Sequence, residues 1–330
     1  MQQYHGSSAF LVKSIFLDYN MHMKFLIIAT ETDGTTKFAE FLESKGCSVE
    51  ISTLNEDNTL LFSKIKNADN YILLDSDRLM DNGIFLFMLG RISERGHFAI
   101  FQGKNAESLK PYNPENADFF YAEKKADAMK TLKENFKAYF DADKKRTALN
   151  DLLSRGLPFN ADCMAHFIEK DKPEIVELVY EAGLDLNSFT EEGVPVLCAA
   201  TRCGNFEYVK WLLKRNADVN IISKDRGYSP VMDAVWKKNL EMVKLYIKAG
   251  ADLNIMSRDG QPILVLAVGN GNAKIVEALL KAGADPDVQD GMGMSARSYA
   301  NLFKNADLIK IMNIFFMITS LSTIFIMHKE

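Results

Sequence analysis

Two patterns of hydrophobic and polar positions divide the chain. Between residues 23 and 142, short apolar runs alternate with segments whose apolar residues recur every three or four positions. Unbroken runs are typical of strands buried on both faces, and the periodic segments are typical of amphipathic helices. Between residues 143 and 311 helical periodicity dominates. The pattern therefore predicts an α/β domain followed by an all-α region.

The first region predicts a small doubly covered sheet. The expected strands are residues 24–29, 49–54, 71–74, 97–101 and 118–121, and the expected helices are 35–45, 60–65, 84–94 and 126–140. Strands that alternate with helices imply right-handed crossovers and a parallel sheet with helices on both faces. We interpret residues 23–142 as a Rossmann-like, flavodoxin-like α/β domain.

The second region repeats itself. A five-residue motif begins at residues 183, 216, 250 and 283, in steps of 33, 34 and 33. It consists of Gly or Asn, an apolar residue, Asp, a second apolar residue or Pro, and Asn or Asp. A second landmark, a glycine, keeps the same spacing at residues 193, 227, 260 and 293. Two landmarks with one period near 33 indicate a repeat architecture whose units stack to bury a shared core.

The segments between these landmarks resemble ankyrin repeats. Residues 204–213, 239–247 and 271–280 look like the family's inter-helix turn and second helix, residues 173–179 give an earlier copy, and residues 149–156 a truncated one. The resemblance implies about five repeats over residues 143–311, each a turn and two antiparallel helices. The histidine of the family's first helix is replaced by Cys198, Met232 and Val265, which implies a less stable array.

The resemblance also implies binding of a protein partner, as yet unknown, through the concave face and the finger loops. The concave-face candidates are Glu169, Lys170, Arg202, Cys203, Trp236, Lys237, Gly269 and Asn270, and the finger candidates are Lys224, Asp225, Arg226, Tyr228, Arg258 and Asp259. Trp236 stands out because tryptophan, tyrosine and arginine dominate binding hot spots. The alternative for Trp236 is packing against the neighbouring repeat.

Carboxylates at the predicted strand ends mark a possible ligand site in the α/β domain. Parallel sheets bind ligands beyond the carboxyl ends of their strands, where this chain carries Glu31, Asp75, Asp77 and Asp81. Neither GxGxxG nor GxxxxGK[ST] is present, so dinucleotide-binding and P-loop functions are not supported. We expect a non-catalytic or ligand-binding domain.

Residues 67–75, followed by residues 81–83 and 89–90, resemble the nucleoside 2-deoxyribosyltransferase and TIR-like group. The resemblance implies a catalytic glutamate two residues before Gly90, where this chain has Met88. A thioether neither accepts a proton nor forms a glycosyl ester. Whether the protein is an enzyme therefore stays open, and Met88 argues against catalysis. The alternative is a nucleoside- or nucleotide-processing or sensing enzyme whose ankyrin array recruits a target.

Charge and cysteine content limit which functions and ligands we expect. A net charge of −5 argues against nucleic-acid binding. The cysteines Cys47, Cys163, Cys198 and Cys203 form no CxxC pair, and the five histidines are scattered, so we expect no metal site and no cofactor. Unpaired thiols are typical of a cytoplasmic protein.

The two ends of the chain leave alternatives open. Residues 1–22 read as a disordered or mis-annotated leader, with either Met1 or Met23 as the start. Residues 312–330 form a hydrophobic tail, and the stretch from Ile311 to Met327 has no charged residue. This stretch is a membrane tail anchor, a helix folded onto the array, or an artefact of the gene boundary; the first would make the protein membrane-associated.

The junction between the two regions contains no Gly/Pro/Ser-rich linker, although a flexible tether would need one. We therefore expect the α/β domain to pack on the first repeat and to cover Leu149, Leu152 and Leu153 as a cap.

Overall fold

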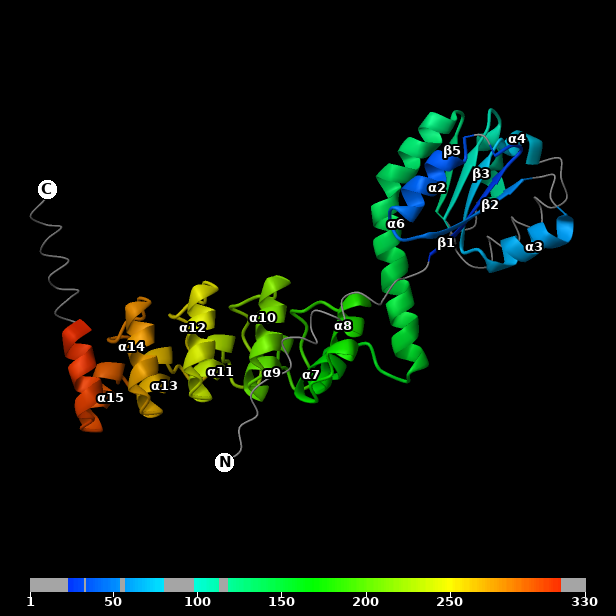
Figure 1. The fold of residues 1–330 in the computed structure, drawn as a ribbon. Coiled ribbons are helices and arrows are strands. Elements are labelled where there is room, and N and C mark those ends of the chain that lie inside the picture. Colours follow the sequence, from blue (N-terminus) through cyan, green and yellow to red (C-terminus); the bar gives the residue numbers. More distant parts are fainter. Residues whose placement is uncertain (1–22, 33, 54–56, 80–97, 113–117, 316–330) are drawn as a thin grey trace, which may run out of the picture. The chain divides into compact units, whose positions relative to one another are not determined.

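The computed structural model describes residues 23–32, 34–53, 57–79, 98–112 and 118–315 (Figure 1). It separates into two compact units, residues 1–144 and 145–330, and each unit is described by itself. The predicted leader, the predicted helix at 84–94 and most of the predicted tail lie outside the described residues.

The first unit contains a five-stranded parallel sheet. Its strands are β1 (Lys24–Ala29), β2 (Ser48–Thr53), β3 (Asn70–Leu74), β4 (Ala99–Gln102) and β5 (Phe119–Ala122). Their order is β2-β1-β3-β4-β5, and every neighbouring pair is parallel. All five predicted strands are confirmed to within two residues.

Helices cover both faces of this sheet (Figure 1). Helices α2 (Thr36–Glu43) and α6 (Lys125–Ser154) pack on the face that carries Phe25 and Ile27. Helix α3 (Asn58–Asn67) and the 3₁₀ helix η2 (Ala106–Tyr112) pack on the face that carries Leu26 and Ile28. Successive residues of β1 thus enter two different cores, which explains its unbroken apolar run. The short helix α4 (Ser76–Leu79) follows β3.

Helix α6 differs from its prediction. We expected a helix at 126–140 and a separate truncated repeat from residue 149, but one helix of 30 residues runs from Lys125 to Ser154. The reason is local: residues 141–148 contain neither glycine nor proline, so nothing in the sequence ends the helix.

The second unit consists of paired helices. They are α7 (Ala161–Glu169) with α8 (Pro173–Glu181), α9 (Val196–Cys203) with α10 (Phe206–Lys214), α11 (Pro230–Trp236) with α12 (Leu240–Lys248), and α13 (Ile263–Gly269) with α14 (Ala273–Lys281). Helix α15 (Ala296–Leu302) pairs with the helical residues 306–315. The predicted stack of helix pairs is confirmed.

The finger turns between pairs are set by glycine. Gly193, Gly227, Gly260 and Gly293 all have positive φ, between 68° and 78°. Gly227 shows a second constraint, because a Cβ atom there would collide with the backbone of Arg258 in the next finger. The period of these glycines therefore reflects both turn geometry and the close approach of neighbouring repeats.

The array forms one continuous hydrophobic core that also includes the end of α6. Leu152 is buried in this core and Leu149 packs against it, whereas Leu153 is 58% exposed. The repeats themselves therefore bury two of the three leucines that we expected the α/β domain to cover. At the other end Leu308 and Met312 are buried in the same core, so the first residues of the predicted tail belong to the array. Within the described residues, no helix is long and apolar enough to cross a membrane.

Candidate functional sites

The loops that join the two helices of each repeat form the first candidate site. We call them the inter-helix row; they comprise residues 169–172, 202–205, 236–239, 269–272 and 302–305. Four of the loops end in an asparagine whose side chain accepts a hydrogen bond from a backbone N–H in the first turn of the second helix: Asn205, Asn239, Asn272 and Asn305. The capping fixes where each loop stops and so positions the residues before it.

Trp236 is the prominent apolar residue of the row. Its side chain is 50% exposed, and its ring meets Tyr228 edge-on with 6.4 Å between centroids. The amide of Asn270 donates a hydrogen bond of 3.0 Å to the carbonyl of Val235, which ties the next loop of the row to the end of α11. Trp236 thus projects from an ordered loop with half of its surface open.

Lysines follow Trp236. Lys237 and Lys238 are exposed, and Lys238 has a left-handed backbone with φ of 57°. The equivalent positions in two other repeats hold Gly204 and Gly271, with φ of 78° and 68°. Asp171 and Lys304 also have left-handed backbones at the equivalent position, each with φ of 52°. Sequence reasoning missed Lys238, although the repeat period placed it in line with those glycines.

Arg202, a predicted partner-binding residue, is engaged within the array. Its Nε donates to the buried Asp233 at 2.9 Å, and its Nη1 donates to Asp225 at 2.7 Å. Its Nη2 also lies 3.3 Å from the hydroxyl of Ser223. Because Arg202 belongs to α9 and Asp233 to α11, the guanidinium joins two neighbouring repeats.

The two carboxylates of this network have opposite pKa shifts. Burial raises the pKa of Asp233 above its usual range, even though Arg202 acts against the shift. For Asp225, partial burial also acts to raise the pKa, but hydrogen bonds from Arg202 and from the backbone hold it well below the usual range. Sequence reasoning missed Asp233, which is an acidic residue inside an apolar helix.

The predicted finger residues lie at successive turns. The ammonium group of Lys224 lies 4.3 Å from the ring centroid of Phe189 in the preceding finger, and the guanidinium of Arg258 donates to the carbonyl of Lys224. Arg226 lies 3.9 Å from Asp225. Stacking between fingers thus occupies several of the cations that we predicted to face a partner.

At the start of the inter-helix row, the predicted partner-binding residues Glu169 and Lys170 are exposed.

The carboxyl edge of the sheet forms the second candidate site. Asp75 follows β3 with a left-handed φ of 59°. Its carboxylate accepts a hydrogen bond of 2.9 Å from Thr30, which follows β1, and lies 3.8 Å from the ammonium group of Lys125. The backbone N–H of Asp75 donates to Gln102 at the end of β4. Side chains from four parts of the chain therefore meet at the point where the strand order reverses.

Asp77 has a different role at the carboxyl edge of the sheet. Its two carboxylate oxygens accept the backbone N–H groups of Lys104 and Asn105, at 2.7 and 2.8 Å. A Cβ at Gly103 would lie 2.8 Å from Asp77 and from the buried hydroxyl of Ser76, so only glycine fits there. Asp77 therefore anchors the loop after β4. Glu31 is exposed at the end of β1, and Asp81 and Met88 lie outside the described residues.

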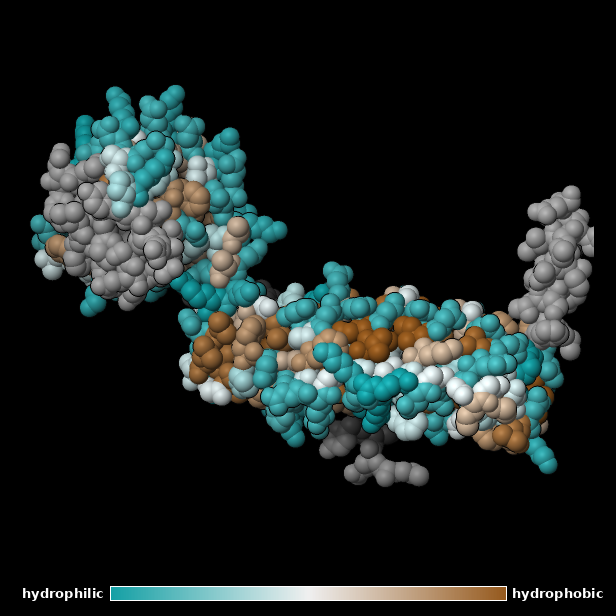
Figure 2. Space-filling model, turned by 180° about the vertical axis from the view of Figure 1, so that it is seen from behind, coloured by the Kyte–Doolittle hydropathy of each residue, from teal (hydrophilic) through white to brown (hydrophobic). Residues whose placement is uncertain are grey.

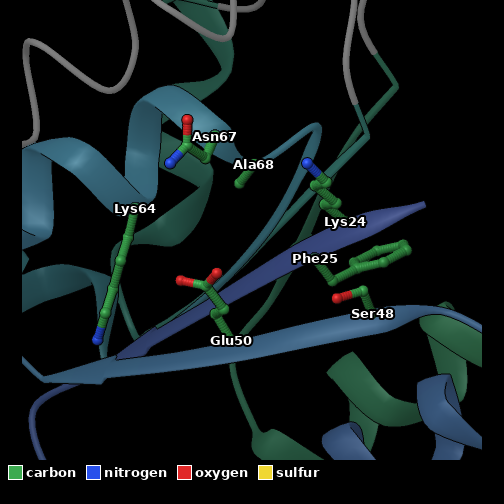
Figure 3. A pocket seen from close by; sticks show the side chains of 7 residues that line it. All are labelled: Lys24, Phe25, Ser48, Glu50, Lys64, Asn67 and Ala68. Carbon is green, nitrogen blue, oxygen red and sulfur yellow. The ribbon is translucent and has the colours of Figure 1, made fainter. Parts of the chain in front are cut away.

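A shallow cavity lies at the opposite, amino edge of the sheet (Figure 3). It has a volume of about 290 Å³. Its lining residues come from the start of β1, from β2 and from α3: Lys24, Phe25, Ser48, Glu50, Lys64, Asn67 and Ala68. The ammonium group of Lys64 contacts the carbonyl of Ile51 at 3.3 Å, so part of the rim holds the sheet edge. The sequence carried no motif for this cavity. The described residues hold no group of three potential metal ligands.

Antiparallel helix pairs stacked in register, with glycine finger turns, define a helical repeat protein. Comparison with known proteins identifies the repeat. A family model of three ankyrin repeats matches residues 231–313, and a single ankyrin-repeat model matches residues 193–224. A curated ankyrin repeat-containing protein of Treponema pallidum (strain Nichols) is 30% identical over 171 residues, which is 52% of this chain. The match spans 57% of that relative's length. Residues 193–313 are therefore ankyrin repeats.

Proposed function

We propose that this protein binds a protein partner through its ankyrin repeats, at a surface centred on Trp236 in the inter-helix row. Ankyrin repeats in general serve protein–protein interaction, and solenoids present extended surfaces that suit it. The observation that carries the proposal is the 50% exposure of Trp236 on an ordered loop. A tryptophan held in this way offers a large contact area at a small cost in conformational entropy.

The surroundings of Trp236 support this choice. Tyr228 packs against it, and Lys237 and Lys238 follow it on the same loop. For the array as a whole, Figure 2 shows an interrupted band of apolar surface on the face in view, bordered by polar side chains. An apolar centre with a polar rim is the usual composition of a protein interface.

The test is affinity capture with the full-length chain as bait, using lysate of the source organism. Trp236→Ala should lose a captured protein that the wild type retains. The matched control is Leu153→Ala, which removes another apolar side chain that is 58% exposed but lies outside the row. Equal capture by the wild type and by Trp236→Ala would contradict the proposal.

We further infer that the α/β domain binds a small polar ligand at the carboxyl edge of its sheet. The strand order 2-1-3-4-5 is that of flavodoxin-like domains, in which ligands sit at the point where the order reverses. Asp75 lies at this point, and its strained backbone is a feature that clusters at functional sites. Ligand binding without catalysis agrees with methionine at position 88.

Thermal shift assays with nucleosides and nucleotides test this second function. A ligand of the carboxyl edge should raise the melting temperature of the wild type but not that of Asp75→Asn. A ligand that stabilises both proteins equally binds elsewhere. Release of free base from a nucleoside would instead support the enzyme alternative.

We also propose that the protein is cytoplasmic. Cys47, Cys163, Cys198 and Cys203 are all free, and unpaired thiols suit a reducing compartment.

A further inference from the structure

Charge is unevenly distributed between the two helices of the repeats. On the second helices, exposed lysines form ion pairs with glutamates three or four residues earlier: Lys210 with Glu207, Lys244 with Glu241 and Lys281 with Glu277. These pairs have nitrogen–oxygen distances between 2.7 and 3.1 Å. Each glutamate thus pairs with one lysine of its helix, and the second lysine of each helix, Lys214, Lys248 or Lys274, leaves a formal charge of +1.

The last three loops of the inter-helix row are different. Residues 236–239, 269–272 and 302–305 contain Lys237, Lys238 and Lys304 and no acidic residue. No ion pair involves these lysines within the described part of the chain. This positive stretch belongs to a chain whose net charge is −5, so it is a local concentration of charge and not a consequence of composition.

Backbone geometry gives an independent observation on the same residues. Lys238 and Lys304 adopt left-handed backbones at the position that Gly204 and Gly271 occupy in two other repeats and that Asp171 occupies in a third. Glycine adopts this conformation without strain, whereas a lysine there is strained. Glycine would relieve this strain at both positions, and in these two loops the residue that replaces it is a cation.

Apolar surface accompanies the lysines. Trp236 precedes Lys237 and Lys238, and two further exposed apolar residues, Leu302 and Phe303, precede Lys304. Large apolar side chains and cations thus occur together in the first and third of these loops, whereas residues 269–272 contain neither. A complementary surface has carboxylates that flank apolar side chains.

We propose that residues 236–239 and the two loops after them bind an acidic peptide segment of the partner that carries apolar anchor residues. This inference rests on the proposed function and names the class of partner for the same surface. Lys237 and Lys238 attract the acidic groups, and Trp236 receives an apolar side chain. Because the lysines are exposed, their contribution should fall with rising salt concentration.

The test uses the full-length chain with Trp211→Phe, which leaves Trp236 as the single tryptophan and therefore as a fluorescent reporter. The probes are three short synthetic peptides of equal length. The first combines Asp and Glu with Leu and Phe, the second replaces the acidic residues with Lys, and the third keeps them but replaces the apolar residues with Ser. Binding is measured by Trp236 fluorescence and by anisotropy of labelled peptides, at low and high salt.

The first peptide should bind about tenfold more tightly than the other two, and high salt should weaken it. The double variant Lys237→Glu/Lys238→Glu should transfer the preference to the lysine peptide. The matched control, Lys210→Glu/Lys244→Glu, reverses two lysines on the second helices and should leave the preference unchanged.

Preference for the lysine peptide, absence of binding by all three peptides, or equal binding of the acidic peptide by the double variant would each overturn the inference. If Trp236→Ala nonetheless abolished capture of a partner from lysate, only the partner chemistry would be wrong, and the proposed function would stand.

Discussion

Replacing Arg202 with alanine should destabilise the array more than any loss of a surface ion pair would. The Asp233 side chain is 1% exposed, and its Oδ2 atom accepts from Arg202 at 2.9 Å. Its Oδ1 atom is buried without a hydrogen-bond partner. Removal of Arg202 leaves this carboxylate buried and uncompensated, which costs about 3–5 kcal/mol. An exposed ion pair contributes about 0–1 kcal/mol.

Removing both charges should have a much smaller effect. Arg202→Met/Asp233→Leu exchanges a buried ion pair for apolar side chains of similar length, and such exchanges are neutral or stabilising by about 1–4 kcal/mol. The pair already leaves one carboxylate oxygen unsatisfied, which favours the apolar exchange further. Because Asp225 also loses its partner Arg202, at a cost of about 1 kcal/mol, the double variant should be about as stable as the wild type and well above Arg202→Ala.

The cost of Arg202→Ala should also depend on pH. Burial raises the pKa of Asp233, so the folded state binds this proton more readily than the unfolded state. Stability therefore falls as pH rises through the interval between the unfolded and the folded pKa, and the defect of Arg202→Ala should shrink as pH is lowered into that interval.

Urea denaturation of the full-length chain, followed by far-ultraviolet circular dichroism, measures these effects. The control is Asp225→Asn, which removes the more exposed partner of the same guanidinium and should cost about 1 kcal/mol. If Arg202→Ala cost less than about 1 kcal/mol, or if the double variant were as unstable as the single one, the carboxylate would not depend on Arg202 as the structure indicates.

Three further predictions follow from single residues. Lys238→Gly should stabilise the protein by about 1 kcal/mol in thermal unfolding, because it removes a left-handed lysine; Gly204→Lys, at the equivalent position, should have the opposite sign. The depressed pKa of Asp225 contributes stability that is complete above its unfolded pKa of about 4 and is lost below it. Asp225→Asn should therefore lose less stability than the wild type between neutral and acidic pH, and equal losses would contradict this. Asp77→Ala should destabilise the α/β domain by about 1–3 kcal/mol in urea, since it leaves two backbone N–H groups of the loop after β4 without their acceptor; unchanged unfolding would refute it.

The repeat architecture could be predicted from sequence because its constraints are local and recur. Gly227 needs a left-handed backbone and has no room for a Cβ atom, and the same geometry returns with every repeat. Strands β1 and β3 were predictable for a related reason, since burial on both faces requires an unbroken apolar run. In both cases the residues adjacent in sequence are enough to predict the backbone conformation or the burial of a position.

The contacts of the sites could not be predicted in this way, because they join residues distant in sequence. Thr30 and Asp75 are 45 residues apart, and Arg202 and Asp233 are 31 apart. Nothing in the local sequence distinguishes Asp75, which retains a partly open carboxylate, from Asp77, which binds two backbone groups. The extent of α6 was missed for another reason: the prediction ended the helix at residue 140, although the next glycine is Gly156, just beyond Ser154.

The two charged systems of the array explain why the same residue type at similar positions has different uses. Arg202 lies between two neighbouring repeats, where its planar guanidinium meets two carboxylates and a hydroxyl at once. Its charge is therefore neutralised inside the protein, and it holds the repeats in register. Lys237 and Lys238, one repeat further on, have no such carboxylates and remain in solvent beside a half-exposed tryptophan. Lys238 also has a left-handed backbone that glycine would relieve, as Asp171 does at the equivalent position of the first repeat. Because the charge of Arg202 is used within the array and that of the exposed lysines is not, the lysines are where we would look for contacts with an acidic partner.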